Sequence, residues 1–204
     1  IKARIKGKFR TKQIRTTNPI AVGDFVEVAK NQSGEFVVSN IKERKNYIIR
    51  KSVNLSKEAH IIASNIDLAI LLITISSPVT SPGFIDRFTV TAEAYNIPLL
   101  LVFNKIDIYN SSDFDKLNEY EKTYNSAGYN SLRISANTGV GIEKLKHHIK
   151  NKTTLIAGNS GAGKSTLINQ LIPSIKLKTG DISASHMTGK HTTTFAEMFD
   201  MSSE

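Results

Sequence analysis

The pattern of hydrophobic and polar residues divides the chain near residue 60. Before that point, short stretches alternate apolar with polar or basic residues at a period of two, which is typical of half-buried strands. These stretches cover residues 3–10, 25–28, 35–41 and 46–50. Turn-forming Asn, Pro and Gly residues separate them. The pattern predicts a small all-β barrel over residues 1–58, with an OB-like barrel as the preferred form and an SH3-like barrel as the alternative.

After the change, continuous apolar segments alternate with helical patterns. The apolar segments, which predict buried strands of a parallel sheet, cover residues 67–75, 98–103, 131–134 and 153–157. Helices are expected near residues 84–95, 113–127, 141–149 and 163–171. This alternation predicts an α/β fold over residues 59–204, with a doubly wound, mostly parallel sheet that binds its ligand at the C-terminal ends of the strands.

The charge is distributed unevenly between the two predicted domains. The 204 residues include 27 Lys and Arg against 18 Asp and Glu, a formal net charge of +9. Residues 1–58 contain 14 of the basic and 5 of the acidic residues, so they account for the whole excess. A basic barrel is expected to attract polyanions through phosphate contacts. A solvated basic face without a partner is the alternative.

Composition excludes several classes of protein. The chain has no cysteine, which excludes disulfides, cysteine zinc sites and thiol catalysis within these residues and fits a reducing compartment. No apolar run approaches the roughly 18 residues of a membrane span, and no signal peptide is recognisable. We therefore expect a cytoplasmic protein without a membrane partner.

One segment has the pattern of a phosphate-binding loop. Residues 158–166 match G-x-x-x-x-G-K-[ST], after a predicted strand and at the start of a predicted helix. The glycines allow close backbone approach, and successive N–H groups at the helix N-terminus can hold phosphates. Lys164 is expected to reach the β- and γ-phosphates, and the Ser165 hydroxyl to bind Mg²⁺. The predicted phosphate-binding residues are Asn159, Ser160, Gly161, Ala162, Gly163, Lys164, Ser165 and Thr166.

A second motif, N-K-x-D at residues 104–107, follows a predicted strand and suits a guanine base. The Asp107 carboxylate can accept hydrogen bonds from N1–H and the exocyclic amine of guanine, whereas adenine lacks this pair of donors. Asn104 can join groups around the base, and the aliphatic stem of Lys105 can cover its face. The four residues alone would be a weak signal, but together with the phosphate loop they indicate GTP.

A third element, Ser135-Ala136-Asn137, follows the next predicted strand. In GTPases an S-A-x element at this place supplies a backbone N–H to guanine O6. Many GTPases have Lys at the third position, where Asn137 stands here, so we expect modest guanine affinity. Ser135 and Ala136 complete the predicted base site.

The order of the motifs is unusual. Conventional small GTPases have the phosphate loop first, whereas here N-K-x-D and S-A-x precede it. Because the spatial site matters and the chain order does not, this order indicates a circularly permuted P-loop GTPase domain.

A permuted GTPase domain behind a basic barrel resembles the RsgA (YjeQ) family of ribosome small-subunit-dependent GTPases. Besides the nucleotide motifs, the matching segments are residues 7–10, 18–24 and 189–194. The resemblance implies GTP hydrolysis coupled to late maturation of the bacterial 30S subunit and stimulated by it, with GTP/GDP and Mg²⁺ as ligands. From the charge of the barrel we also expect 16S rRNA as a partner, bound through the barrel, and we expect a monomer.

The resemblance also assigns a first switch to residues 189–194. Thr193 would bind Mg²⁺ and sense the γ-phosphate, with Thr192 or Thr194 as alternatives, and His191 could orient the attacking water. The family's Asp-x-x-Gly switch and its Cys/His zinc domain are not found in these residues, so Zn²⁺ is expected only in a missing C-terminal part. This fragment alone is therefore expected to hydrolyse GTP weakly.

Two other functions fit the sequence less well. One is an RNA-binding assembly factor that uses GTP only as a conformational ligand, with little turnover. The other is a GTPase of tRNA modification, although such proteins usually have the motifs in conventional order.

Overall fold

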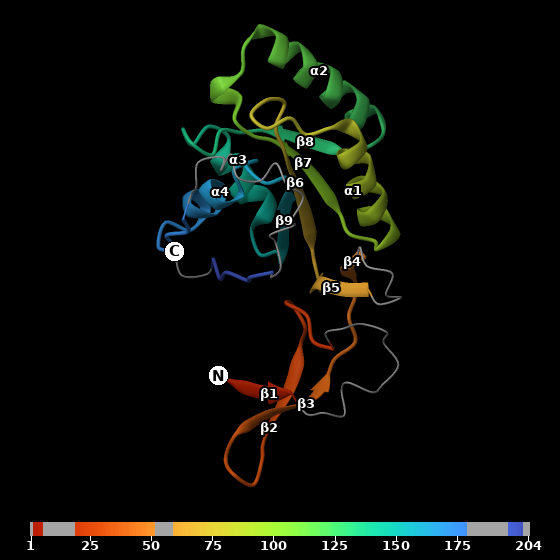
Figure 1. The fold of residues 1–204 in the computed structure, drawn as a ribbon, viewed down its shortest axis with the longest axis vertical. Helices are drawn as coiled ribbons and strands as arrows, with labels where there is room; N and C mark the ends of the chain where they lie inside the picture. The colour runs from red at the N-terminus through yellow and green to blue at the C-terminus, as the bar shows by residue number, and fades with distance from the viewer. Residues whose placement is uncertain (1, 6–18, 52–58, 179–195, 202–204) are drawn as a thin grey trace, which may run out of the picture. The chain divides into compact units, whose positions relative to one another are not determined.

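The computed structural model describes residues 2–5, 19–51, 59–178 and 196–201 (Figure 1). Two compact units separate in it: Ile1–Ile66 with Thr193–Met198, and Asp67–Thr192 with Phe199–Glu204. The first unit extends beyond residue 58 because β5 (Ala59–Ser64) pairs with β4 (Tyr47–Lys51) inside it. Strand β5 is not among the strands expected from the sequence.

The first unit consists of two small sheets. One has the order β1-β3-β2, in which β3 (Phe36–Ile41) runs parallel to β1 (Ala3–Ile5) and antiparallel to β2 (Val26–Lys30). The other is the antiparallel β4–β5 pair, which a bridge between Val22 and Ala63 links to the turn before β2. The predicted strands are present, but the described residues show the OB-like barrel only in part. The end of the first predicted strand lies outside them.

The turn at residues 22–24 is tied to distant parts of this unit through Asp24. Its carboxylate accepts hydrogen bonds from the Ala21 amide at 2.9 Å and from the Ser64 hydroxyl at 2.6 Å. Arg44 donates to both carboxylate oxygens, at 2.6 and 2.7 Å, and the Asp24 side chain is fully buried. Gly23 precedes it with φ +91°, and an added Cβ would lie 2.2 Å from the Ser64 carbonyl oxygen. Only glycine therefore fits this turn.

The buried Asp24 makes the stability of the first unit sensitive to acid. Burial raises the pKa of Asp24, but hydrogen bonds from Arg44, Ala21 and Ser64 lower it more, so the net pKa lies below the usual value. A lowered folded-state pKa gives stability that is complete above the unfolded-state pKa and is lost as the pH falls through the folded-state pKa. We expect Asp24→Asn to lower the free energy of unfolding at neutral pH by about 3 kcal/mol, because Arg44 loses its charged partner. Chemical unfolding from neutral pH into acid measures both effects.

Asp115→Asn provides the control, because Asp115 is exposed on a surface helix. If both variants had the same stability and the same acid dependence, the assigned role of Asp24 would be wrong.

The second unit has a four-stranded parallel sheet with the order β8-β7-β6-β9. Each strand is followed by a helical segment, as the sequence predicted. The elements in chain order are β6 (Leu68–Ile73), α1 (Pro82–Ala94), β7 (Leu99–Phe103), η2 (Ile106–Ile108), α2 (Ser111–Ser126), β8 (Asn130–Arg133), α3 (Ile142–Ile149), β9 (Thr154–Gly158) and α4 (Lys164–Leu171).

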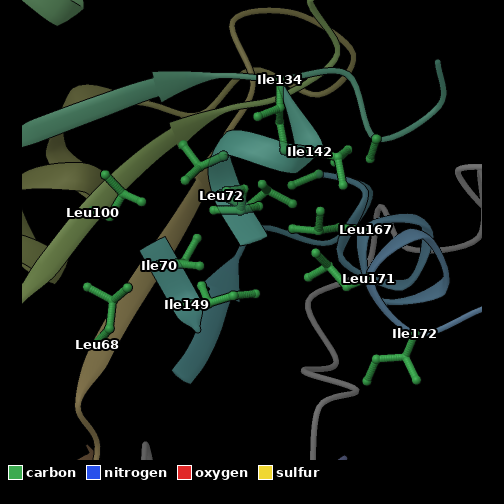
Figure 2. Close-up of a cluster of buried hydrophobic side chains, with 14 residues drawn as sticks. Leu68, Ile70, Leu72, Leu100, Ile134, Ile142, Ile149, Leu167, Leu171 and Ile172 are labelled. Atoms are coloured by element: carbon green, nitrogen blue, oxygen red, sulfur yellow. The ribbon is translucent and has the colours of Figure 1, made fainter. Parts of the chain in front are cut away.

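Helices cover both faces of this sheet. Leu68, Ile70 and Leu72 of β6 pack toward α3 and α4, as Figure 2 shows, and belong to the cluster that includes Leu145 and Leu167. The alternate residues of the same strand face the opposite cluster, which includes the buried side chains of α1 and α2. Strand β6 is buried along its whole length for this reason. The sheet is doubly wound, as expected.

The permuted chain order is visible in the strand pairing. Strand β9, the last of the sheet in sequence, runs parallel beside β6, the first. The loop after β9 and the loop after β7 therefore leave the same edge of the sheet, although they are far apart in sequence. None of the helices in the described part of the chain has the length and apolarity needed to cross a bilayer.

Candidate functional site

The predicted phosphate loop connects a strand to a helix, as its chemistry requires. Strand β9 ends at Gly158 and α4 begins at Lys164, so residues 159–163 lie at the helix N-terminus, where backbone N–H groups suit an anion. Gly163 has φ +97°, and an added Cβ would lie 2.5 Å from the Asn104 side-chain nitrogen. Asn159 is half-buried, Ala162 is buried, and Ser160 and Gly161 are exposed.

Lys164 points back into this loop. Its Nζ donates to the carbonyl oxygens of Gly158 at 2.8 Å and of Asn159 at 2.7 Å. Burial lowers the pKa of Lys164, and a bound phosphate would favour the charged form again. Ser165 and Thr166 follow in the first helical turn and are half-buried. The glycine at the close approach and the ammonium inside the loop fit a nucleotide triphosphate, and Ser165 is placed where a hydroxyl could bind Mg²⁺.

Asn104 joins the three predicted elements. Its side-chain nitrogen donates to the Ala162 carbonyl of the phosphate loop at 2.9 Å, and its side-chain oxygen accepts from the Ala136 amide at 2.9 Å. Asn104 is 1% exposed, so both bonds are shielded from water. The Ala136 amide is thereby used within the protein, and the contact of an S-A-x backbone N–H with guanine O6 stays a prediction.

Asp107 is oriented by Ser135. The Ser135 hydroxyl donates to Asp107 Oδ1 at 2.6 Å and accepts from the Thr138 amide at 3.1 Å. Only one carboxylate oxygen of Asp107 has this contact, so the carboxylate keeps acceptor capacity for a ligand. Lys105 has φ +69°, and its Nζ donates to the Ser77 carbonyl oxygen at 2.5 Å. Burial lowers the pKa of Lys105, while Asp107 raises it less.

The hydroxyl of Tyr109 holds the backbone of the N-K-x-D segment at residues 104–107, called the base loop from here on. The sequence did not predict this contact. It donates to the Asn104 carbonyl oxygen at 2.6 Å and accepts from the Ile75 amide at 2.8 Å. Burial raises the pKa of Tyr109 to about 12, so it stays a neutral donor. In the sequence, Tyr109 is marked only by its position two residues after the N-K-x-D motif. That position alone does not indicate a role for the side chain.

A cavity of about 260 Å³ lies where these elements meet. Its volume is below the roughly 300–1,000 Å³ that encloses a drug-sized ligand, so it suits a base better than a whole nucleotide. The lining residues are Asn104, Lys105, Asp107, Ile108, Ala136, Asn137, Gly163 and Thr166.

The predicted switch residues His191 and Thr193 lie outside the described residues. The same holds for Thr192 and Thr194. Among the residues that are described, no group of three or more His, Cys, Asp or Glu could hold a metal ion.

The bridging role of Asn104 leads to a prediction about stability. Asn104→Ala would leave a buried amide and a buried carbonyl without partners, at a cost of about 1–3 kcal/mol for each unsatisfied group. We therefore expect the free energy of unfolding of the second unit to fall by about 2 kcal/mol or more, measured by chemical unfolding.

Asn104→Asp separates the two bonds. Asp keeps the acceptor for the Ala136 amide but places a carboxylate oxygen against the Ala162 carbonyl. We expect it to be no more stable than Asn104→Ala. A wild-type stability in either variant would contradict the bridge.

In comparisons with known proteins, this chain is similar to members of one family. The family model for the RsgA GTPase matches residues 41–204. Over 205 residues the chain is 53% identical to the small ribosomal subunit biogenesis GTPase RsgA of Flavobacterium psychrophilum, covering 99% of this chain and 63% of the relative. Over 197 residues it is 51% identical to the protein of the same name from Porphyromonas gingivalis, covering 96% of this chain and 62% of the relative.

Two solved structures are also similar. The crystal structure of YjeQ from Thermotoga maritima aligns with a TM-score of 0.67 and 37% identity, over 87% of this chain and 59% of that one. The structure of YloQ, described as a circularly permuted GTPase, aligns with a TM-score of 0.59 and 30% identity, over 84% and 55%. The chain thus spans less than two thirds of the length of each of these relatives.

Proposed function

The chain belongs to the RsgA GTPase family, and from this premise we propose that it binds GTP and takes part in hydrolysing it to GDP and phosphate. The observation that carries the proposal is the double contact of Asn104. It joins the base loop to the phosphate loop and to the S-A-x loop, so residues from three separate segments line one cavity.

The base selectivity rests on Asp107. Its carboxylate lines the cavity and is oriented by Ser135. A purine that offered no donors to this carboxylate would cover it without replacing its hydrogen bonds to water, which is costly. Guanine offers two donors on one edge, so the cavity favours GTP over ATP.

Binding and hydrolysis of the phosphates would use the loop at residues 159–166. Lys164 would neutralise the β- and γ-phosphates, and the Ser165 hydroxyl would bind Mg²⁺, which supplies charge neutralisation at the phosphates when bound. By the family resemblance, Thr193 would complete the metal site and His191 would help to orient water. Zn²⁺ would belong to a part of the longer protein outside this chain.

The partner proposed here is the small ribosomal subunit, as the names of the relatives state for those proteins. The first unit would serve as the basic barrel that contacts 16S rRNA, because all of the net charge lies in residues 1–58. The second unit would be the permuted GTPase domain. We further propose that the protein acts in the cytoplasm as a monomer, in late maturation of the 30S subunit.

The test is GTP turnover by the full chain with and without 30S subunits, with ATP as the competing nucleotide. We expect binding of GTP and GDP but not ATP, and faster hydrolysis when subunits are added. Equal binding of ATP would refute the base site. Binding of GTP without turnover, even in the presence of subunits, would favour the alternative in which GTP is only a conformational ligand.

A deletion tests the role of the barrel. Removing residues 1–66 takes away the whole first segment of that unit and avoids leaving β5 without its partner. Nucleotide binding should persist and stimulation by subunits should be lost. Stimulation that survived the deletion would argue against the barrel as the subunit contact.

A further inference from the structure

A basic surface lies on the second unit, although the sequence beyond residue 58 is neutral in sum. Helix α3 buries Ile142, Leu145 and Ile149 against the sheet. The opposite side of this helix and the turn after it are exposed and basic. The exposed residues there are Lys144, His147, His148, Lys150 and Lys152.

Although the net charge of this part of the chain is zero, the two faces of the sheet carry helices of opposite charge. Helices α1 and α2, on one face, contain six acidic residues against three basic ones. The segment from α3 to Lys152, on the other face, contains four Lys against one acidic residue, Glu143. Figure 1 shows the two helical layers on opposite sides of the sheet. Along the chain the two acidic helices come first and the basic segments follow, and the fold places them on opposite faces of the sheet.

The same layer has a second basic segment after α4. Ile175 packs against the hydrophobic cluster of this face. Asn169 then fixes the chain by accepting from the Leu177 amide at 2.9 Å and donating to the Leu177 carbonyl at 3.0 Å. Lys176 and Lys178, on either side of this fixed point, are exposed. The segment after α4 therefore presents two lysines from a defined backbone position.

Helix stability alone does not explain these charges. Cations near a helix C-terminus interact favourably with its dipole, which accounts for Lys146. Lys146 also forms an ion pair with Glu143 at 3.0 Å. Lys144, however, lies in the first turn, where a cation is unfavourable, and Lys152 lies beyond the helix. Both would be favoured by an external polyanion.

We propose that this face of the second unit, formed by α3 and the segments that follow α3 and α4, is a second contact surface for ribosomal RNA. It would bind phosphate groups of the RNA backbone and act together with the barrel. The proposal rests on the proposed function, because the polyanion that a ribosome-dependent GTPase meets is rRNA. Two basic surfaces on one chain would raise the affinity through simultaneous contacts and not through a stronger single contact.

The experiment compares two double variants of the full 204-residue chain that remove the same charge. Lys144→Ala/Lys152→Ala changes the basic face, and Lys116→Ala/Lys122→Ala removes two exposed lysines from the acidic layer on α2. Binding to protein-free 16S rRNA is measured as a function of salt. Each phosphate contact contributes roughly 0.7–0.9 to the slope of log K against log salt. We expect the first variant to lower the slope by about 1.4–1.8 and the second to change it little.

GDP binding serves as the folding control and should be unchanged in both variants, since none of the four lysines lines the nucleotide cavity. Equal slopes for the two variants would overturn the second surface while leaving the proposed function intact. A loss of binding to whole subunits but not to free rRNA would indicate an acidic protein as the partner and would also overturn it. Failure of the wild-type chain to bind rRNA at all would refute both the barrel contact and this surface.

Discussion

Asp107→Asn is expected to weaken GDP binding roughly 10- to 100-fold, because hydrogen bonds to a charged group contribute about 1.5–3 kcal/mol. The amide of Asn can accept one hydrogen bond from guanine N1–H, but its nitrogen meets the exocyclic amine as donor against donor. The fold should survive, since Ser135 can still donate to the remaining oxygen. Nucleotide affinities measured by fluorescence titration test this directly.

Xanthosine diphosphate sharpens the test. Xanthine has a carbonyl where guanine has its amine, so the Asn amide can donate to it. The variant should therefore prefer xanthosine diphosphate over GDP, which a general loss of structure could not produce. Asp115→Asn, on the exposed side of α2, should keep the wild-type preference. Unchanged guanine selectivity in Asp107→Asn would refute the assignment of the base site.

Lys164→Ala is expected to have the second large effect, a loss of GTP affinity of roughly 100-fold together with loss of turnover. The ammonium is held inside the loop by the carbonyls of Gly158 and Asn159, so it is placed before the ligand arrives. Its removal takes away the positive charge opposite the β- and γ-phosphates, where charge stabilisation dominates phosphoryl transfer. Equilibrium binding and single-turnover hydrolysis separate the two losses.

The same lysine predicts a pH dependence. Burial lowers the pKa of Lys164, and only the protonated form favours phosphate. Affinity should therefore be complete below the folded-state pKa and decrease as the pH rises through it on the alkaline side. Lys164→Arg keeps the charge at all accessible pH values, so its affinity should be lower but independent of pH. The same pH profile in both proteins would show that another group titrates.

Much of the second unit could be predicted from the sequence because its signals are local. Strand β6 is apolar along its whole length since both faces of the sheet are covered, and such a run is recognisable without knowledge of the fold. The phosphate loop was found by residue types at a fixed spacing. The strand and helix that flank Lys164 are where that spacing requires them.

Other features depend on contacts between distant segments and could not be predicted. Strand β5 is a short, mixed segment, and its identity as a strand comes from pairing with β4. Tyr109 holds the base loop through its hydroxyl, but a tyrosine in a loop predicts no particular partner. The opposing charges of the two helical layers likewise require knowledge of which helices share a face.

The double contact of Asn104 couples the binding of the base to the binding of the phosphates. Because one buried side chain supports both loops, the phosphate loop is preorganised by the base loop even when the ligand has no base. Inorganic triphosphate should therefore lose affinity when Asn104 is replaced, although no atom of that ligand reaches the base pocket. The two loops would then be ordered together. The conformational entropy of ordering them would be lost when the protein folds and not when the ligand binds.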